Sequence, residues 1–98
     1  MHDVATPTTR CTVWWAAPVD PESAPELVDL LDEHERDRLA RFRRPADRER
    51  YLAAHALARL VLAPFAGTAA DALAFDRTCR CGAPHGKPVL PGGPGFSL

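Results

Sequence analysis

The chain has 98 residues, of which 46% are hydrophobic and 26% are charged, and its formal net charge is −1. This length is typical of one small domain. It excludes a large enclosed active site, because a domain of this size buries only roughly 60–68% of the surface of its unfolded chain. The near-neutral charge gives no global attraction to nucleic acid or to a membrane, so we expect neither as a partner. A sizeable substrate is expected to lie in a surface groove or at a junction with another domain.

The charges are unevenly distributed along the chain. Residues 20–35 contain seven acidic residues and no Lys or Arg, whereas residues 36–59 contain eight Arg. A cluster of Arg side chains can bind a phosphorylated ligand through forked hydrogen bonds. The alternative is solvated helix pairs, because Asp32 and Asp37 each precede an Arg by four residues. Composition leaves both interpretations open.

Cysteine content and the N-terminus bear on the compartment. The chain has three cysteines, and a disulfide between Cys79 and Cys81 would be strained because one residue separates them. Residues 1–4 lack the basic start and apolar stretch of a signal peptide, and no apolar run approaches the roughly 18 residues of a membrane span. We therefore expect a cytoplasmic protein with reduced thiols.

The N-terminal third is predicted to hold one strand and one short helix. Residues 1–10 are polar and are expected to be disordered, and residues 11–17 are rich in aromatic and β-branched side chains and predict a strand. Ser23 followed by Glu26 has the spacing of a capping box, with a proline between them in the first turn. A short helix through residues 27–31 is expected to follow.

Two further helices are predicted in the middle of the chain. Asp32, with Glu35 three residues later, predicts the start of a helix that ends near residues 43–45. A third helix is predicted from Asp47 to about Ala63. Its apolar stripe has helical spacing and consists of Leu52, Ala56, Leu57, Leu60 and Val61.

The last third of the chain predicts short strands and loops. Residues 73–76 and 87–90 are expected to be strands, residues 80–86 a loop, and residues 95–98 the opening of a further strand. The expected fold class is α+β, with three helices and a small sheet. Because a chain terminus is usually polar, the apolar ending predicts that the chain is cut in a strand or pairs with a strand elsewhere.

Three local groups could carry chemistry. His85-Gly86-Lys87-Pro88 combines a glycine that allows close backbone approach with a cation suited to phosphate, although without further context a β-turn with one exposed Lys is the favoured interpretation. Cys79, Cys81 and His85 offer three zinc ligands, but their spacing fits a structural zinc site poorly. His55, inside the third predicted helix, is interpreted as a packed or capping histidine.

Five motifs in order resemble the N-terminal half of the Sfp-type 4′-phosphopantetheinyl transferases. The match covers nearly all of the chain from Val13 onward. The motifs are Val13-Trp14-Trp15; Leu31 to Arg38 with Arg41-Phe42; Asp47 to His55 with Arg59; Cys81-Gly82 with His85-Gly86-Lys87-Pro88; and Gly95-Phe96-Ser97-Leu98.

The resemblance implies a fold, a reaction and partners. In that family two similar α+β halves hold coenzyme A in the cleft between them, so residues 11–98 would be one half-domain, cut off in a strand. The reaction moves the phosphopantetheine arm of coenzyme A to a serine of an acyl or peptidyl carrier protein, with Mg²⁺. Such carriers serve fatty acid, polyketide or nonribosomal peptide biosynthesis.

The resemblance also implies site residues. Arg38 and Lys87 would contact coenzyme A, with His85, Gly86 and Pro88 contributing the loop beside Lys87. Some family members have a basic residue where this chain has Glu35. The family's Ser-His pair, its Asp-x-Glu and later Glu for Mg²⁺, and its Trp-x-x-Lys-Glu helix have no counterpart in this chain.

No catalytic residue or metal ligand is therefore assigned here. We expect the Mg²⁺ ligands on a missing C-terminal half, and we expect this chain to be inactive alone. The alternative from a different class is a non-catalytic small domain that binds a nucleotide-like ligand or a protein. A Cys/His metal module is a third reading.

Overall fold

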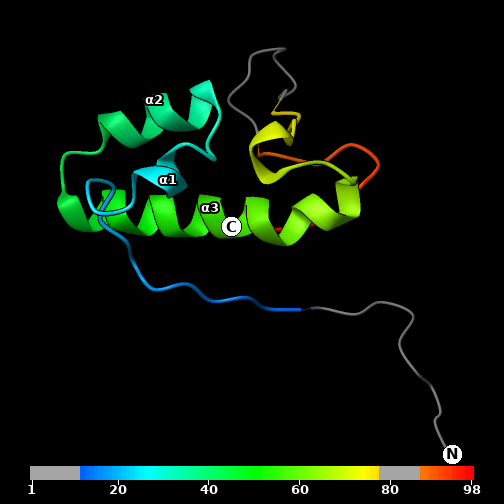
Figure 1. Ribbon diagram of the computed structural model, residues 1–98, viewed down its shortest axis with the longest axis horizontal. Coiled ribbons are helices and arrows are strands. Elements are labelled where there is room, and N and C mark those ends of the chain that lie inside the picture. Colours follow the sequence, from blue (N-terminus) through cyan, green and yellow to red (C-terminus); the bar gives the residue numbers. More distant parts are fainter. Residues whose placement is uncertain (1–11, 78–86) are drawn as a thin grey trace, which may run out of the picture.

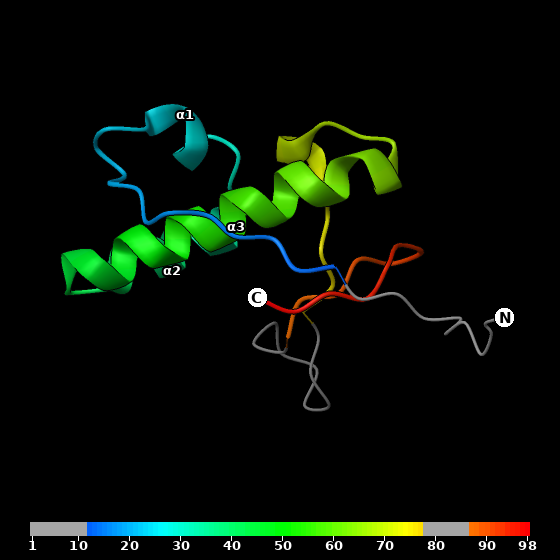
Figure 2. The same cartoon turned by 90° about the horizontal axis from the view of Figure 1, so that it is seen from below.

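The computed structural model describes residues 12–77 and 87–98. Its helices are α1 (Pro25–Val28), α2 (Glu33–Arg41) and α3 (Pro45–Ala66), followed by a single 3-10 turn, η1 (Ala70–Ala72). The other elements pack along the long helix α3. Helices α1 and α2 lie along its N-terminal half, and η1 and the C-terminal residues lie along its C-terminal half (Figures 1 and 2).

The cap predicted for the first helix is wrong. The helix begins at Pro25, its N-cap is Ala24, and no side chain caps it. The Ser23 hydroxyl instead donates to Asp20 Oδ2 at 3.2 Å, while Asp20 Oδ1 accepts from the Glu22 N–H at 3.0 Å. A turn around Asp20 thus takes the hydroxyl that the predicted capping box needs.

The predicted start of the second helix is confirmed. Asp32 is the N-cap of α2, and its Oδ1 accepts from the Glu35 N–H at 2.8 Å. The Glu35 carboxylate returns the contact, accepting from the Asp32 N–H at 3.0 Å. This capping box satisfies two backbone donors that have no partner within the helix.

The third helix is longer than predicted at both ends. It begins at Pro45, a favoured first residue because proline has no N–H to leave unpaired there. It continues through Pro64 and ends at Gly67, whose φ of 67° is the left-handed conformation that glycine adopts without a steric penalty. Glycine, rather than proline, therefore terminates this helix.

The predicted apolar stripe of the third helix is partly wrong. Leu52 and Ala56 are buried, but Leu60 is 52% exposed. Arg59 occupies the neighbouring core position instead. The buried side of α3 therefore includes a charged residue, which the apolar stripe alone did not predict.

Two hydrophobic clusters pack against opposite ends of α3. The first joins Leu31, in the segment between α1 and α2, to Leu39 of α2 and Leu52 of α3. The second joins Leu62 and Ala63 of α3 to Leu73 and Leu90, with Phe75 and Phe96 packed beside it. The two Phe rings are tilted against each other with centroids 5.5 Å apart.

The predicted α+β class, with a small sheet, is wrong for the described residues. They form a small helical domain. The strands expected at 73–76, 87–90 and 95–98 are not formed, and neither is the described part, 12–17, of the strand expected at 11–17. A single antiparallel bridge joins Asp76 to Val89 through two 2.8 Å backbone hydrogen bonds. Strand-like composition was insufficient, because a sheet needs backbone partners at several successive residues.

Residues 12–18 run in an extended conformation past α3, on the side opposite α2 (Figures 1 and 2). They join the domain where the Val19 N–H donates to the Glu49 carbonyl at 3.2 Å. Residues 1–10, expected to be disordered, lie outside the described residues. Within the described ranges, no helix has both the length and the apolar character that crossing a membrane requires.

Candidate functional site

A network of charged side chains lies buried where α2, α3 and the segment after η1 meet. Its centre is the pair Glu35 and Arg59, which are 1% and 0% exposed. The capping box of α2 places Glu35 one turn into that helix, facing α3. A buried ion pair is tolerated only when hydrogen bonds satisfy both partners, so the contacts of each decide what the network does.

Each nitrogen of the Arg59 guanidinium contacts oxygen. Nε donates to Glu35 Oε1 at 2.7 Å, and Nη2 donates to Asp32 Oδ2 at 3.0 Å. Nη1 donates to the carbonyls of Ala70 and Leu73, at 3.0 and 3.1 Å. The planar fork of Arg suits this arrangement. It ties the N-terminus of α2 to the chain that follows α3.

The second oxygen of Glu35 faces His55. His55 Nδ1 lies 2.9 Å from Glu35 Oε2, and the imidazole stacks on the Tyr51 ring with centroids 3.9 Å apart. The prediction of a packed histidine is thus confirmed, although its carboxylate partner is 20 residues away in the sequence. The residues next to His55 in the sequence therefore gave no sign of this carboxylate.

Burial alone would raise the pKa of the Glu35 carboxyl. The hydrogen bonds from His55, the Asp32 backbone and Arg59, together with the Arg59 charge, outweigh burial and lower that pKa to about 2. Burial and the negative charge of Glu35 raise the pKa of the Tyr51 hydroxyl to about 12. The carboxylate is therefore held ionised and the phenol neutral at neutral pH.

Arg77 extends the network to the surface. Its Nη1 donates to Asp32 Oδ2 at 3.0 Å, and its Nη2 lies 3.7 Å from Glu35 Oε2. The guanidinium carbons of Arg59 and Arg77 lie 5.0 and 5.5 Å from the centroid of the Phe75 ring. Such contacts between cations and an aromatic ring are favourable. They fix Phe75 beside both arginines.

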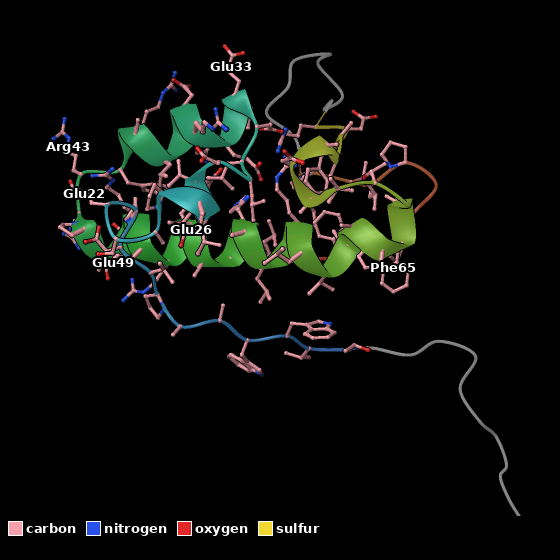
Figure 3. The ribbon with its side chains drawn as sticks, in the orientation of Figure 1. Glu22, Glu26, Glu33, Arg43, Glu49 and Phe65 are labelled. Atoms are coloured by element: carbon pink, nitrogen blue, oxygen red, sulfur yellow. The ribbon has the colours of Figure 1, made fainter. Side chains whose placement is uncertain are left out.

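An open groove of about 1020 Å³ lies between the outer side of α2 and the segment after η1. Glu33, at the start of α2, projects away from the body of the protein at its edge (Figure 3). The groove carries charges of both signs beside one aromatic ring. It is lined by Glu33, His34, Arg36, Asp37, Phe75, Asp76 and Arg77.

Neither of the two predicted coenzyme-binding cations, Arg38 and Lys87, lines this groove. Arg38 is exposed on α2, four residues and thus about one turn after the wall residue His34. Lys87 is exposed and lies two residues before Val89, which pairs with the opposite-wall residue Asp76.

The other predicted site residues are only partly covered. Pro88 is half-buried beside Lys87. His85 and Gly86 lie outside the described residues, as do the candidate zinc ligands Cys79 and Cys81. Among residues 12–77 and 87–98, no three His, Cys, Asp or Glu side chains are arranged to hold a metal ion.

The helix-pair interpretation of the Arg cluster is half right. Asp37 and Arg41 form the predicted surface pair at 3.0 Å. Arg36 instead donates to the carbonyls of Val28 and Asp29, at 3.3 and 3.1 Å. Asp32 instead accepts hydrogen bonds from Arg59 and Arg77, which explains why it does not pair with Arg36.

Comparisons of the chain with family models, with curated proteins and with solved structures found no significant match.

Proposed function

We propose that this chain is the coenzyme A-binding half of a 4′-phosphopantetheinyl transferase. The proposal rests on the ordered motifs from Val13 to Leu98. The structural observation that supports it is an open groove beside α2, with Arg38 exposed on that helix and Lys87 exposed two residues before Val89, the bridge partner of the groove residue Asp76. The expected sheet is not formed, so the proposed binding of coenzyme A involves the groove and not a sheet.

The chemistry of coenzyme A suits such a groove. The coenzyme carries a pyrophosphate and a 3′-phosphate, and fixed cations hold such anions through charge-assisted hydrogen bonds. Arg38 supplies a planar fork and Lys87 a compact point charge. Both side chains are exposed, so neither must leave a buried partner to reach a ligand.

The described residues do not fit a magnesium site, since no three of their His, Cys, Asp or Glu side chains are arranged to hold a metal ion. No step of phosphopantetheine transfer is therefore assigned to this chain. The proposed contribution is to bind and orient coenzyme A, while a complementary part of the enzyme supplies the metal ligands. The purified 98-residue chain is accordingly expected not to load a carrier protein.

A calorimetric titration with coenzyme A tests the proposal. Arg38→Ala and Lys87→Ala should each weaken binding about 10- to 100-fold, as expected for the loss of a hydrogen bond to a charged group. Arg43→Ala is the matched control, because Arg43 projects into solvent at the far end of α2 (Figure 3). Equal affinities for all three variants, or no binding by the parent chain, would reject the proposal.

A non-catalytic binding domain is the second candidate. The observation that favours it is that Arg77, which lines the groove, is already engaged by Asp32. Such a domain would bind a partner without contributing to transfer. The same titration separates the two candidates, because this one predicts no dependence on Arg38 and Lys87.

A further inference from the structure

A second pocket, of about 350 Å³, lies where α1, α2 and the start of α3 meet. On the α2 side it is lined by Arg36, Leu39 and Ala40, which share one face of the helix because they are three and four residues apart. Arg36 also donates to the carbonyls of Val28 and Asp29, at 3.3 and 3.1 Å. These two hydrogen bonds tie the end of α1 to α2 and fix that side of the pocket.

Arg48, near the start of α3, lines the pocket with a guanidinium that the protein does not satisfy. Its Nε is buried and has no hydrogen-bond partner in the described ranges. A buried donor without an acceptor is unfavourable, and such groups are rare in folded proteins. Arg59 provides the contrast, because each of its nitrogens contacts oxygen. The guanidinium of Arg48 is therefore suited to an acceptor that comes from outside the domain.

The remaining lining of the pocket combines an apolar floor with carboxylates. Leu39 is 4% exposed, and Val28 packs against the same hydrophobic cluster. Glu22 and Asp29 are exposed at the pocket, and Figure 3 places Glu22 at the end of the domain where α3 begins. The charged residues of the lining are thus two arginines and two carboxylates, and their formal charges cancel.

We propose that this pocket binds a small zwitterion with an aliphatic body, which is the chemistry of a free aliphatic amino acid. The ligand carboxylate pairs with the Arg48 guanidinium, whose planar edge suits two parallel hydrogen bonds. The ligand ammonium faces the carboxylates of Glu22 and Asp29, and its aliphatic part lies on Val28 and Leu39.

The charges of the pocket select against simpler ligands. A ligand with a carboxylate alone would be repelled by the two carboxylates of the lining, and a ligand with an ammonium alone would be repelled by Arg48. The volume of about 350 Å³ is at the lower end of the range for small-molecule sites, which suits a compact ligand.

This pocket is distinct from the groove proposed for coenzyme A. The two linings share Arg36 alone, and Arg48 lines only the pocket. The inference therefore does not rest on coenzyme binding, and a failed titration with one ligand leaves the proposal for the other intact.

Calorimetric titration of the full chain with three probes of related carbon skeleton tests the inference. Leucine carries both charges, isocaproate lacks the ammonium, and isoamylamine lacks the carboxylate. We expect leucine to bind at least about tenfold more tightly than either single-charge probe, because each of these loses one charged contact. Absence of leucine binding, or equally tight binding of either single-charge probe, overturns the inference.

Substitutions distinguish a binding role of Arg48 from a structural one. Arg48→Met keeps a long side chain but removes the unpartnered donor, so leucine binding should weaken about tenfold or more while the thermal unfolding midpoint stays the same or rises. Arg50→Met is the matched control, because Arg50 is exposed, pairs with Asp47 at 3.5 Å and lines neither the pocket nor the groove.

A second variant tests the pocket without altering a charge. Ala40 is exposed on α2, so Ala40→Leu narrows the pocket without disturbing the core, and it should also weaken leucine binding. Circular dichroism confirms that each variant keeps its helices. Leucine binding that survives either Arg48→Met or Ala40→Leu at full strength overturns the inference, because the ligand would then lie elsewhere.

Discussion

The two sides of α3 show opposite relations between residue type and burial. On the inner side a charged residue, Arg59, is completely buried, and each of its nitrogens contacts oxygen. On the outer side the uncharged residue Phe65 is mostly exposed. Whether a side chain of this helix is buried therefore depends on the contacts that the fold offers it. Hydrophobicity alone would wrongly predict an exposed Arg59 and a buried Phe65.

The largest effect is expected from Arg59→Leu. Removing one member of a buried ion pair leaves the other charge uncompensated, which typically costs about 3–5 kcal/mol. Here Glu35 would remain buried with one fewer cation, and the carbonyls of Ala70 and Leu73 would lose their donor. Urea unfolding measures the change, and a loss below about 1 kcal/mol would contradict a central role for Arg59.

Asp32→Ala should have the next largest effect, about 2 kcal/mol. The substitution removes the N-cap of α2, usually worth about 1 kcal/mol, together with the ion pairs to Arg59 and Arg77. Asp32→Asn separates the two contributions, because Asn keeps an oxygen for the cap but carries no charge. If both variants lose the same stability in urea, the charge matters and the cap does not.

Acid should weaken the inner side through Glu35. Its pKa is lowered to about 2 in the folded protein from 4.5, so the unfolded chain binds more protons between these values. The stability that Glu35 contributes is therefore complete above about pH 4.5 and is lost as pH falls towards 2.

Unfolding free energies measured across this pH range check the prediction. Because other carboxyls also titrate there, the comparison is with Glu35→Gln, which has no ionisable group at this position. The parent chain should lose more stability on acidification than this variant. Parallel curves for the two proteins would show that Glu35 has an ordinary pKa.

The smallest effect is expected at the exposed pair of Asp37 and Arg41. Both side chains are more than half exposed, and surface pairs of this spacing contribute about 0.3–0.5 kcal/mol. Arg41→Ala should therefore change stability by no more than about 0.5 kcal/mol, with a smaller change at high salt. A loss comparable to that of Arg59→Leu would erase the distinction between buried and surface charges.

Local signals in the sequence predicted the helices, and non-local contacts explain what was missed. The Asp32 and Glu35 spacing predicted the start of α2, whereas α3 extends to Ala66, past the end predicted at about Ala63. The sheet was predicted from strand-like composition, yet strands require partners distant in sequence. Only Asp76 and Val89 pair in the described part of the chain.

The candidate site was likewise predictable only where its sequence signals are local. The sequence indicated Arg38 and Lys87 as separate cations, but not the groove, because its lining joins residues of α2 to residues 75–77, about 40 positions later in the sequence. The ion pair of Glu35 and Arg59 spans 24 residues and was missed altogether. Its one signal was an Arg at a core position of an otherwise apolar helical stripe.

The position of Arg59 also bears on how the domain unfolds. Its Nε and Nη2 are held from the side of the first hydrophobic cluster, while its Nη1 is held by carbonyls beside the second. If either cluster opens, the Arg59 guanidinium loses some of its hydrogen-bond acceptors while the other cluster still keeps it buried. One guanidinium thus couples the two small cores, because opening either of them removes hydrogen bonds from the same buried charge.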